Sequence, residues 1–292
     1  MPCYSPIKGF RGVDGSLVMA RHKSTGIPMH VPCRQCIGCR IERSRQWGVR
    51  MMHEASLHRD NCFVTLTYAD HSLPVSGSLN VVDVQKFFKR FRKEIAPTKI
   101  RYFHCGEYGG ETGRPHYHLA LFGYDFPDKV VVAERGGYPV WRSDLLERLW
   151  SMGNCEIGSL TFDSAVYIAK YITKRVTGRL AESHYSRVDP DTGEVFQIAP
   201  EYATMSRRPG IGAGWLKKYK GDVYPSDEVI VNGHSCKPPA FYDRMLPEAE
   251  LEAIKARRRD RRDSENQTDE RLAVREIVKR SELSTFTKER SL

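Results

Sequence analysis

The stretch that decides the fold is residues 99–123, KIRYFHCGEYGGETGRPHYHLALFG. Its two ends, 99–105 and 116–123, are rich in aromatic and apolar residues, and the connection 106–115 is rich in glycine. Two such runs joined by a Gly-containing connection predict the two antiparallel strands of a hairpin. The stretch therefore predicts an antiparallel sheet in the middle of the chain.

Helices and further strands are predicted on both sides of this hairpin. Alternation and β-branched residues predict a strand over 62–68, and apolar residues at helical spacing predict a helix over 80–95. After the hairpin we expect a helix over 143–151, a short strand over 154–160 and a helix over 163–175. The order strand–helix–strand–strand–helix–strand matches the split βαβ, or ferredoxin-like, order. The predicted fold class is α+β, an antiparallel central sheet with helices on one face.

Composition divides the chain into three regions, 1–57, 58–240 and 241–292. The first is predicted to be irregular up to residue 32 and helical over 41–57, and it carries a cluster of cysteines. The second carries the predicted sheet and the candidate catalytic residues, and from residue 178 it is expected to be rich in loops. The third is highly charged with few apolar residues, which predicts a partly disordered or helical tail.

The 292-residue chain is basic, with 46 Lys and Arg against 36 Asp and Glu and a formal net charge of +10. One basic block runs over 34–59. A second runs from Lys86 to Arg101, where seven basic residues face only Glu94. This excess favours a polyanionic partner. No apolar run approaches the roughly 18 residues of a membrane helix, and residues 1–12 lack the apolar segment of a secretory signal. An integral membrane protein is therefore excluded, and a packed core is expected.

Cys33, Cys36 and Cys39 place three thiols within seven residues, and Cys3 lies upstream. Thiols at this spacing can surround one tetrahedral ion, so we predict that the four cysteines bind a structural Zn²⁺. Small buried residues without a metal, or an iron–sulfur cluster, are the alternatives. The other four cysteines are isolated and are expected to be buried packing residues.

His116 and His118 lie two residues apart on a predicted strand, so both side chains point to the same face. The hairpin would bring Glu107, at the end of the preceding strand, close to both. Two imidazoles and one carboxylate with open positions suit Mn²⁺ or Mg²⁺ acting as a Lewis acid. His104 and Glu111 are the competing third ligands. A surface pair of histidines without a metal is the alternative.

Tyr167, Lys170, Tyr171 and Lys174 have the spacing i, i+3, i+4, i+7 and share one face of a predicted helix. A neutral phenol attacks poorly, and a nearby ammonium group favours the phenolate and stabilises charge on a phosphate. The face therefore predicts two tyrosine nucleophiles assisted by two lysines. An amphipathic helix whose Tyr and Lys side chains border solvent is the alternative.

Taken in order, these motifs resemble the rolling-circle replication initiators of the HUH endonuclease superfamily. The resemblance is carried by FVTLTY at 63–68, RPHYH at 114–118 and the Tyr-x-x-Lys-Tyr-x-x-Lys motif beginning at Tyr167. Tyr117 occupies the hydrophobic position between the histidines, a mild departure from the pattern. The paired tyrosines match the two-tyrosine group.

The cysteine cluster running into CRIERSRQW at 39–47, together with GEYG at 106–109, is similar to the gokushovirus-type replication-associated proteins of the Microviridae. The likeness covers roughly residues 30–220. It implies an HUH endonuclease fold acting on single-stranded DNA at a viral origin, in the cytoplasm of the bacterial host, beside the host helicase and polymerase.

The resemblance also implies a mechanism. The metal held by His116, His118 and Glu107 polarises the scissile phosphate, and one tyrosine attacks it. A 5′-phosphotyrosine link and a free 3′-OH result, and host polymerase extends the 3′-OH. The second tyrosine then cuts the regenerated origin.

Two other classes of function stay open at this point. A non-enzymatic, zinc-containing nucleic-acid-binding protein would explain the charge but not the Tyr–Lys helix face. A metal-dependent nuclease that uses water would form no covalent adduct. Neither the origin sequence, the order in which the tyrosines act, the metal used in the cell nor the oligomeric state follows from the sequence.

Overall fold

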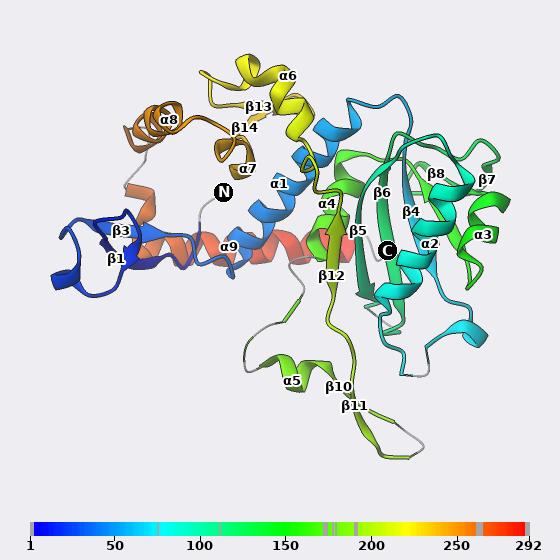
Figure 1. Ribbon diagram of the computed structural model, residues 1–292. Helices are drawn as coiled ribbons and strands as arrows, with labels where there is room; N and C mark the ends of the chain where they lie inside the picture. The colour runs from blue at the N-terminus through cyan, green and yellow to red at the C-terminus, as the bar shows by residue number, and fades with distance from the viewer. Residues whose placement is uncertain are drawn as a thin grey trace. The chain divides into compact units, whose positions relative to one another are not determined.

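The computed structural model of the chain (Figure 1) forms two compact units. The larger unit is formed by 44–245, and the smaller one by 1–43 together with 246–292. The structure describes residues 3–74, 76–110, 112–171, 175–176, 178, 180–189, 192–260 and 265–289.

The larger unit contains a seven-stranded sheet of order β12-β5-β6-β4-β9-β8-β7, in which all neighbours are antiparallel. The strands are β4 (Asn61–Thr67), β5 (Arg101–Tyr108), β6 (Pro115–Phe122), β7 (Val130–Arg135), β8 (Tyr138–Arg142), β9 (Cys155–Gly158) and β12 (Tyr202–Met205). The predicted antiparallel sheet and the β5–β6 hairpin are confirmed. Strands β7, β8 and β12 extend the sheet beyond the four strands that the sequence pattern predicts. Because β7 is exposed along its whole length, it shows no alternation of buried and exposed positions.

Two helical connections cross the sheet. Strands β4 and β5 both pair antiparallel with β6, so they run parallel to each other, and α2 (Val81–Glu94) joins them past β6. Likewise β6 and β9 both flank β4, and α3 (Asp144–Trp150) precedes β9. The hydroxyl of Ser143 and the side-chain oxygen of Asn80 accept backbone N–H groups at the starts of α3 and α2, as N-caps do.

Helices cover both faces of the sheet. Leu119 and Leu121 of β6 join a core cluster with α2 and α3. Ala120 and Phe122, which point the other way, join a second cluster with α1 (Ile37–Ala55) and α4 (Phe162–Tyr171). The expectation of helices on one face is therefore wrong, because α1 and α4 cover the other face.

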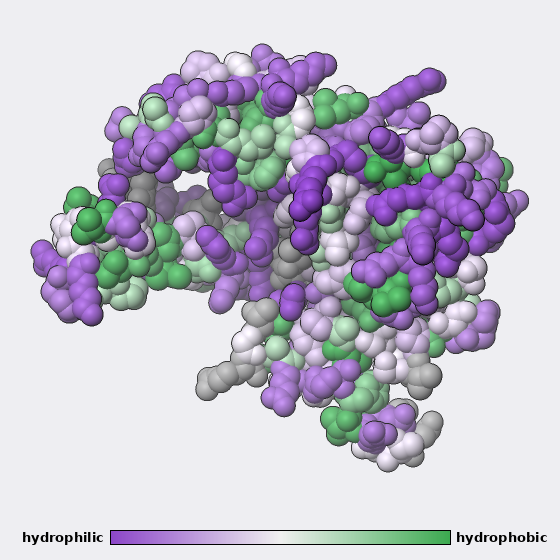
Figure 2. Space-filling view, viewed as in Figure 1, coloured by the Kyte–Doolittle hydropathy of each residue, from purple (hydrophilic) through white to green (hydrophobic). Residues whose placement is uncertain are grey.

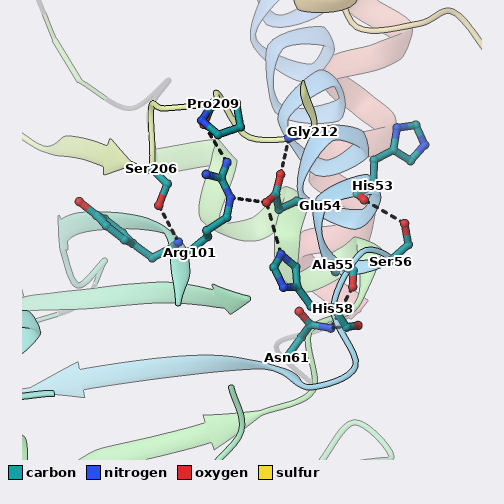
Figure 3. Close-up of polar contacts among 11 residues, drawn as sticks. His53, Glu54, Ala55, Ser56, His58, Asn61, Arg101, Ser206, Pro209 and Gly212 are labelled. Atoms are coloured by element: carbon teal, nitrogen blue, oxygen red, sulfur yellow. Dashed lines mark hydrogen bonds and ion pairs between the residues drawn. The ribbon is translucent and has the colours of Figure 1, made fainter. Parts of the chain in front are cut away.

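A buried carboxylate ties α1 to β5 and to the segment before α6 (Ala213–Val223) (Figure 3). Glu54 is 2% exposed and pairs with Arg101. It also accepts the N–H of Gly212 at 2.7 Å, and Arg101 donates to the Pro209 carbonyl at 2.8 Å. Gly212 has φ +78°, a left-handed conformation that favours glycine. Arg101 thus serves the fold.

The region expected to be rich in loops from residue 178 contains several short elements besides α6 and β12. They are α5 (Leu180–Tyr185), β10 (Ser186–Val188), β11 (Val195–Gln197), β13 (Val229–Val231), β14 (His234–Cys236) and α7 (Ala240–Asp243). Each spans three to six residues. Elements this short show too little periodicity for a sequence pattern to predict them.

In the smaller unit, residues 3–32 are not irregular as expected. They form a three-stranded sheet of β1 (Ile7–Arg11), β2 (Leu17–Val18) and β3 (Pro28–Val31), with η1 (Arg21–Lys23) between. The charged tail forms α8 (Glu248–Asp260), η3 (Glu265–Gln267) and α9 (Asp269–Glu289). Ion pairs within the helices, such as Lys255–Glu252 in α8 and Arg280–Glu276 in α9, join side chains one turn apart. The described part of the tail is therefore helical, which is one of the two predicted possibilities.

Candidate active site and metal-binding groups

The β5–β6 register brings the three predicted metal ligands together. Glu107 lies directly opposite His116, and Cys105 lies opposite His118. Oε1 of Glu107 is 2.8 Å from Nε2 of His116 and 3.1 Å from Nε2 of His118. Glu107 is 2% exposed and His118 is 5% exposed. These two side chains project from the face of the sheet and are covered by other parts of the chain.

The structure removes one competing ligand. His104 lies on the opposite face of the sheet, where Nδ1 is 2.9 Å from the Thr204 hydroxyl and the ring packs against Tyr117. Burial lowers its pKa to about 3. Glu111, the other competitor, lies outside the described residues.

A backbone carbonyl and a hydroxyl orient the histidines. Nδ1 of His116 donates to the Arg114 carbonyl at 3.1 Å, and Nδ1 of His118 lies 3.0 Å from the Thr65 hydroxyl. Both rings therefore turn Nε2 toward Glu107. Thr65 has no predicted role from sequence, although its strand is part of the FVTLTY motif. The pairing of β4 with β6, which sets Thr65 opposite His118, shows that this threonine contacts the imidazole.

The hydrogen bonding of His116 tests whether these residues suit a metal. A carbonyl and a carboxylate face its two nitrogens, and neither group can donate, whereas a neutral imidazole carries only one N–H. A cation between Nε2 and Glu107, or a second proton on the ring, would satisfy both contacts. Adjacent ligands of an octahedral ion with bonds of about 2.1 Å lie about 3.0 Å apart. The observed 2.8 and 3.1 Å match that spacing, so the group can hold a small divalent ion.

Both predicted tyrosines lie against this group. The rings of Tyr167 and Tyr171, one turn apart on α4, have centroids 5.3 and 5.5 Å from that of His118. Tyr167 is 41% exposed and Tyr171 only 5%. Burial raises the pKa of both phenols, and for Tyr167 a hydrogen bond with Tyr171 acts in the opposite direction. Lys170 is exposed on the same helix, and Lys174 lies outside the described residues.

In the smaller unit, the four predicted cysteines converge, with all Sγ atoms within 4.8 Å of one another. Sγ of Cys3 is 3.5 Å from that of Cys33 and 3.9 Å from that of Cys36, and Sγ atoms of Cys33 and Cys39 are 4.0 Å apart. Sulfurs at about 2.3 Å from a tetrahedral zinc would lie about 3.8 Å apart. Backbone N–H groups of Tyr4 and Cys36 donate to the sulfurs of Cys36 and Cys33 at 3.3 and 3.2 Å. The pKa of Cys36 is lowered to about 7, because backbone N–H donors outweigh its burial, whereas burial raises the pKa of Cys3 and Cys39.

Of the four isolated cysteines, three are buried as expected, and the fourth is not. Cys236 is half-buried, and its sulfur accepts a hydrogen bond from Arg45. Within the described part of the chain, no helix has the length and apolar character needed to cross a membrane.

Comparison with known proteins supports the resemblance. The family model "Replication-associated protein ORF2/G2P" matches residues 61–176, the segment that carries the His–Glu group and α4. Replication-associated protein ORF2 of Spiroplasma virus 4 is 32% identical over 271 residues, 84% of this chain and 80% of the relative. Replication-associated protein VP4 of Bdellovibrio phage phiMH2K is 32% identical over 254 residues, 83% of this chain and 76% of the relative.

A third relative, replication-associated protein ORF4 of Chlamydia phage 1, is 26% identical over 234 residues, 77% of this chain and 55% of the relative. No solved structure matches the chain. The alignments with the first two relatives cover 84% and 83% of this chain, whereas the family model matches only residues 61–176. The chain belongs to the family of viral replication-associated proteins.

Proposed function

We propose that the protein is a replication initiator that nicks and rejoins single-stranded DNA at a viral origin through a tyrosine. The contact of Tyr167 and Tyr171 with His118, one of three groups that can hold a metal, carries the proposal. It joins a nucleophile to an electrophilic centre, as transesterification at a phosphate requires. The strand order β9-β4-β6-β5 supports the ferredoxin-like order of an HUH endonuclease.

Two metals enter the proposal. Glu107, His116 and His118 would hold Mg²⁺ or Mn²⁺, which when bound supplies Lewis-acid polarisation of the scissile phosphate. Cys3, Cys33, Cys36 and Cys39 would hold a structural Zn²⁺, since four thiolates leave no open position. Region 1–57 would thus be a zinc-binding module, 58–240 the catalytic domain, and 241–292 an accessory tail.

The side chains of α4 perform the bond exchange. The phenol oxygen of one tyrosine attacks phosphorus, and the bond from phosphorus to the 3′ oxygen breaks. The phenol proton is released and the 3′ oxygen gains a proton, so no water is consumed and the phosphodiester energy is kept in the 5′-phosphotyrosine. Lys170 and Lys174 stabilise the developing negative charge. The second tyrosine repeats the exchange when the origin is regenerated, and the released 3′-OH closes the circle.

The partners follow from this chemistry. The DNA must be single-stranded or extruded at the origin, because the phosphate has to reach α4. A host polymerase would extend the 3′-OH and a host helicase would displace the strand, in the cytoplasm of the bacterial host.

Trapping of a covalent adduct tests the proposal. Labelled single-stranded fragments, tiled across the genome that encodes the chain, are incubated with the protein and Mn²⁺ and run on denaturing gels. We expect one fragment to give an adduct that EDTA prevents and that His118→Ala removes. Cleavage without an adduct would indicate a nuclease that uses water. Binding without cleavage would indicate a non-enzymatic DNA-binding protein.

A further inference from the structure

The basic block at Lys86–Arg101 lies mainly on α2. That helix packs on the sheet face formed with Leu119 and Leu121, whereas α4 and its tyrosines pack on the other face. The outer surface of α2 is further separated from the sheet by one helix diameter, about 10 Å. Basic side chains there cannot contact the phosphate that lies at Tyr167. The block therefore needs a role other than holding the scissile strand in the site.

The arginines of the block serve the fold. Arg90 donates to the Leu149 carbonyl at 2.9 and 2.7 Å at the end of α3, and Arg101 pairs with the buried Glu54. Arg92 lies over the rings of Phe88 and Tyr102. These three side chains account for almost half of the block's charge without any ligand.

The lysines of the block differ from the arginines. Three of the block's four lysines, Lys86, Lys89 and Lys93, lie on α2 and are exposed, and within the described residues none of these three has a hydrogen bond or ion pair. Glu94, the acidic residue of the block, forms an ion pair with Arg148, with an N–O distance of 2.7 Å. The space-filling view in Figure 2 shows that the surface over α2 is largely hydrophilic.

Other charged helices of this chain look different. On α8 and α9, Lys255 pairs with Glu252, Lys279 with Glu282 and Arg280 with Glu276. Such (i, i+3) and (i, i+4) pairs stabilise a solvated helix, whereas like charges at these spacings destabilise it. The lysines at i, i+3 and i+7 of α2 therefore cost helix stability, and an external polyanion would remove that cost.

We propose that the row formed by Lys86, Lys89 and Lys93 binds the backbone of duplex DNA, as a second DNA contact outside the tyrosine site. The row is straight and spans about 10 Å along the helix. The three phenylalanines of α2 are buried, so its outer face offers no ring on which unpaired bases could stack, as single-strand sites do. Lysines alone suit sequence-independent phosphate contacts. The inference rests on the proposed function, since it assigns duplex DNA flanking the origin to this row.

The test compares duplex and single-strand affinity, and neither measurement needs cleavage. Lys86→Gln/Lys89→Gln/Lys93→Gln is compared with the intact chain by fluorescence anisotropy on a 20-base-pair duplex of arbitrary sequence and on one of its strands. We expect duplex affinity to fall about tenfold or more at 0.1 M salt, and the slope of log affinity against log salt to fall by about 2 to 3. Single-strand affinity should change less than threefold. The Lys→Arg triple variant should retain duplex affinity.

The matched control is Lys217→Gln/Lys218→Gln/Lys237→Gln, which removes the same charge from other exposed positions. If the control loses as much duplex affinity, the effect is one of net charge and the proposal fails. An equal loss on single strand and duplex, or no loss on either, also overturns it. If duplex binding depends on the row but the chain forms no adduct, the row stands and the proposed nicking function falls.

Discussion

The imidazole of His118 lies almost parallel to the phenol ring of Tyr171, with ring centroids 5.5 Å apart and planes inclined by 15°. Tyr167 meets the same imidazole nearly edge-on, at 76°. The stacked ring is 5% exposed and the edge-on one 41%. The two phenols therefore occupy different environments, although sequence spacing makes them look equivalent.

This difference predicts which tyrosine acts first. Tyr167→Phe should remove the first covalent adduct, because Tyr167 is the more exposed of the two residues and is the more accessible to an incoming strand. Tyr171→Phe should keep the first adduct and lose rejoining, and the double variant should form no adduct while still binding DNA. Mass spectrometry of the peptide covering 163–175 identifies the attached residue. Equal first adducts from both single variants would show that the phenols substitute for each other, and an adduct on a residue outside α4 would refute the catalytic assignment.

Thr65 should control metal affinity without touching the metal. Its hydroxyl lies 3.0 Å from Nδ1 of His118 and holds the ring with Nε2 toward Glu107. Thr65→Val keeps the shape and removes this contact, so Mn²⁺ affinity measured by calorimetry should fall about 10- to 100-fold. Thr67→Val is the matched control, since that hydroxyl donates to the Asn154 carbonyl. A Thr65 variant that binds Mn²⁺ like the unaltered chain would leave this hydroxyl without a role in orienting His118.

The cysteine group should bind one zinc per chain. X-ray absorption should show sulfur ligands at about 2.3 Å, and Cys36→Ser should lose zinc measured by elemental analysis. Cys155→Ser, at a buried cysteine remote in sequence from the group, is the control and should keep it. Stoichiometric zinc in the Cys36 variant, or a spectrum without sulfur, would contradict the assignment.

The hydroxyl of Tyr117 should stabilise the fold. The side chain is fully buried, and its hydroxyl donates to the Asn80 carbonyl at 3.0 Å and accepts the Asn80 N–H at 2.9 Å. Tyr117→Phe leaves both backbone groups at the start of α2 without this partner, which should lower the free energy of unfolding by about 1–3 kcal/mol. Urea unfolding measures the change, and Tyr138→Phe, at an exposed tyrosine, should have no effect. Equal stability of both variants would mean that the loop reorganises.

His53 should make stability depend on pH. Burial lowers its pKa to about 4 from the ordinary 6.5, and its ring stacks on Trp215. Because the unfolded chain binds the proton more tightly, this stability is complete above pH 6.5 and is lost as the pH falls toward 4. The loss should reach about 1.6 kcal/mol between pH 6.5 and pH 5. Urea unfolding at both pH values should show a smaller difference for His53→Gln, and an unchanged difference would contradict the assignment.

The sequence pattern was enough to predict the helices and strands whose apolar residues recur with a clear period. Alternation in β4 and helical spacing in α2 follow from side chains a few residues apart, and these elements occur within two residues of the predicted bounds. Strands β7 and β12 lack such a pattern. The first is exposed throughout, and the second has four half-buried residues paired to the edge of β5. Pairing with β5, a strand remote in the chain, accounts for β12, whereas β7 pairs with β8, the next strand along the chain.

The sequence by itself determined which candidate groups lie together where their spacing is short: His116 with His118 on one strand, Tyr167 with Tyr171 one helical turn apart, and Cys33 with Cys36 and Cys39. Tertiary structure decided what depends on register and packing. Strand pairing sets Glu107 directly opposite His116, and tertiary contacts bring Cys3 to the other three thiols. Helix packing exposes Tyr167 and buries Tyr171, and the side of the sheet that α2 covers sets its lysines apart from the site. These outcomes depend on contacts between residues far apart in the chain, which no local pattern encodes.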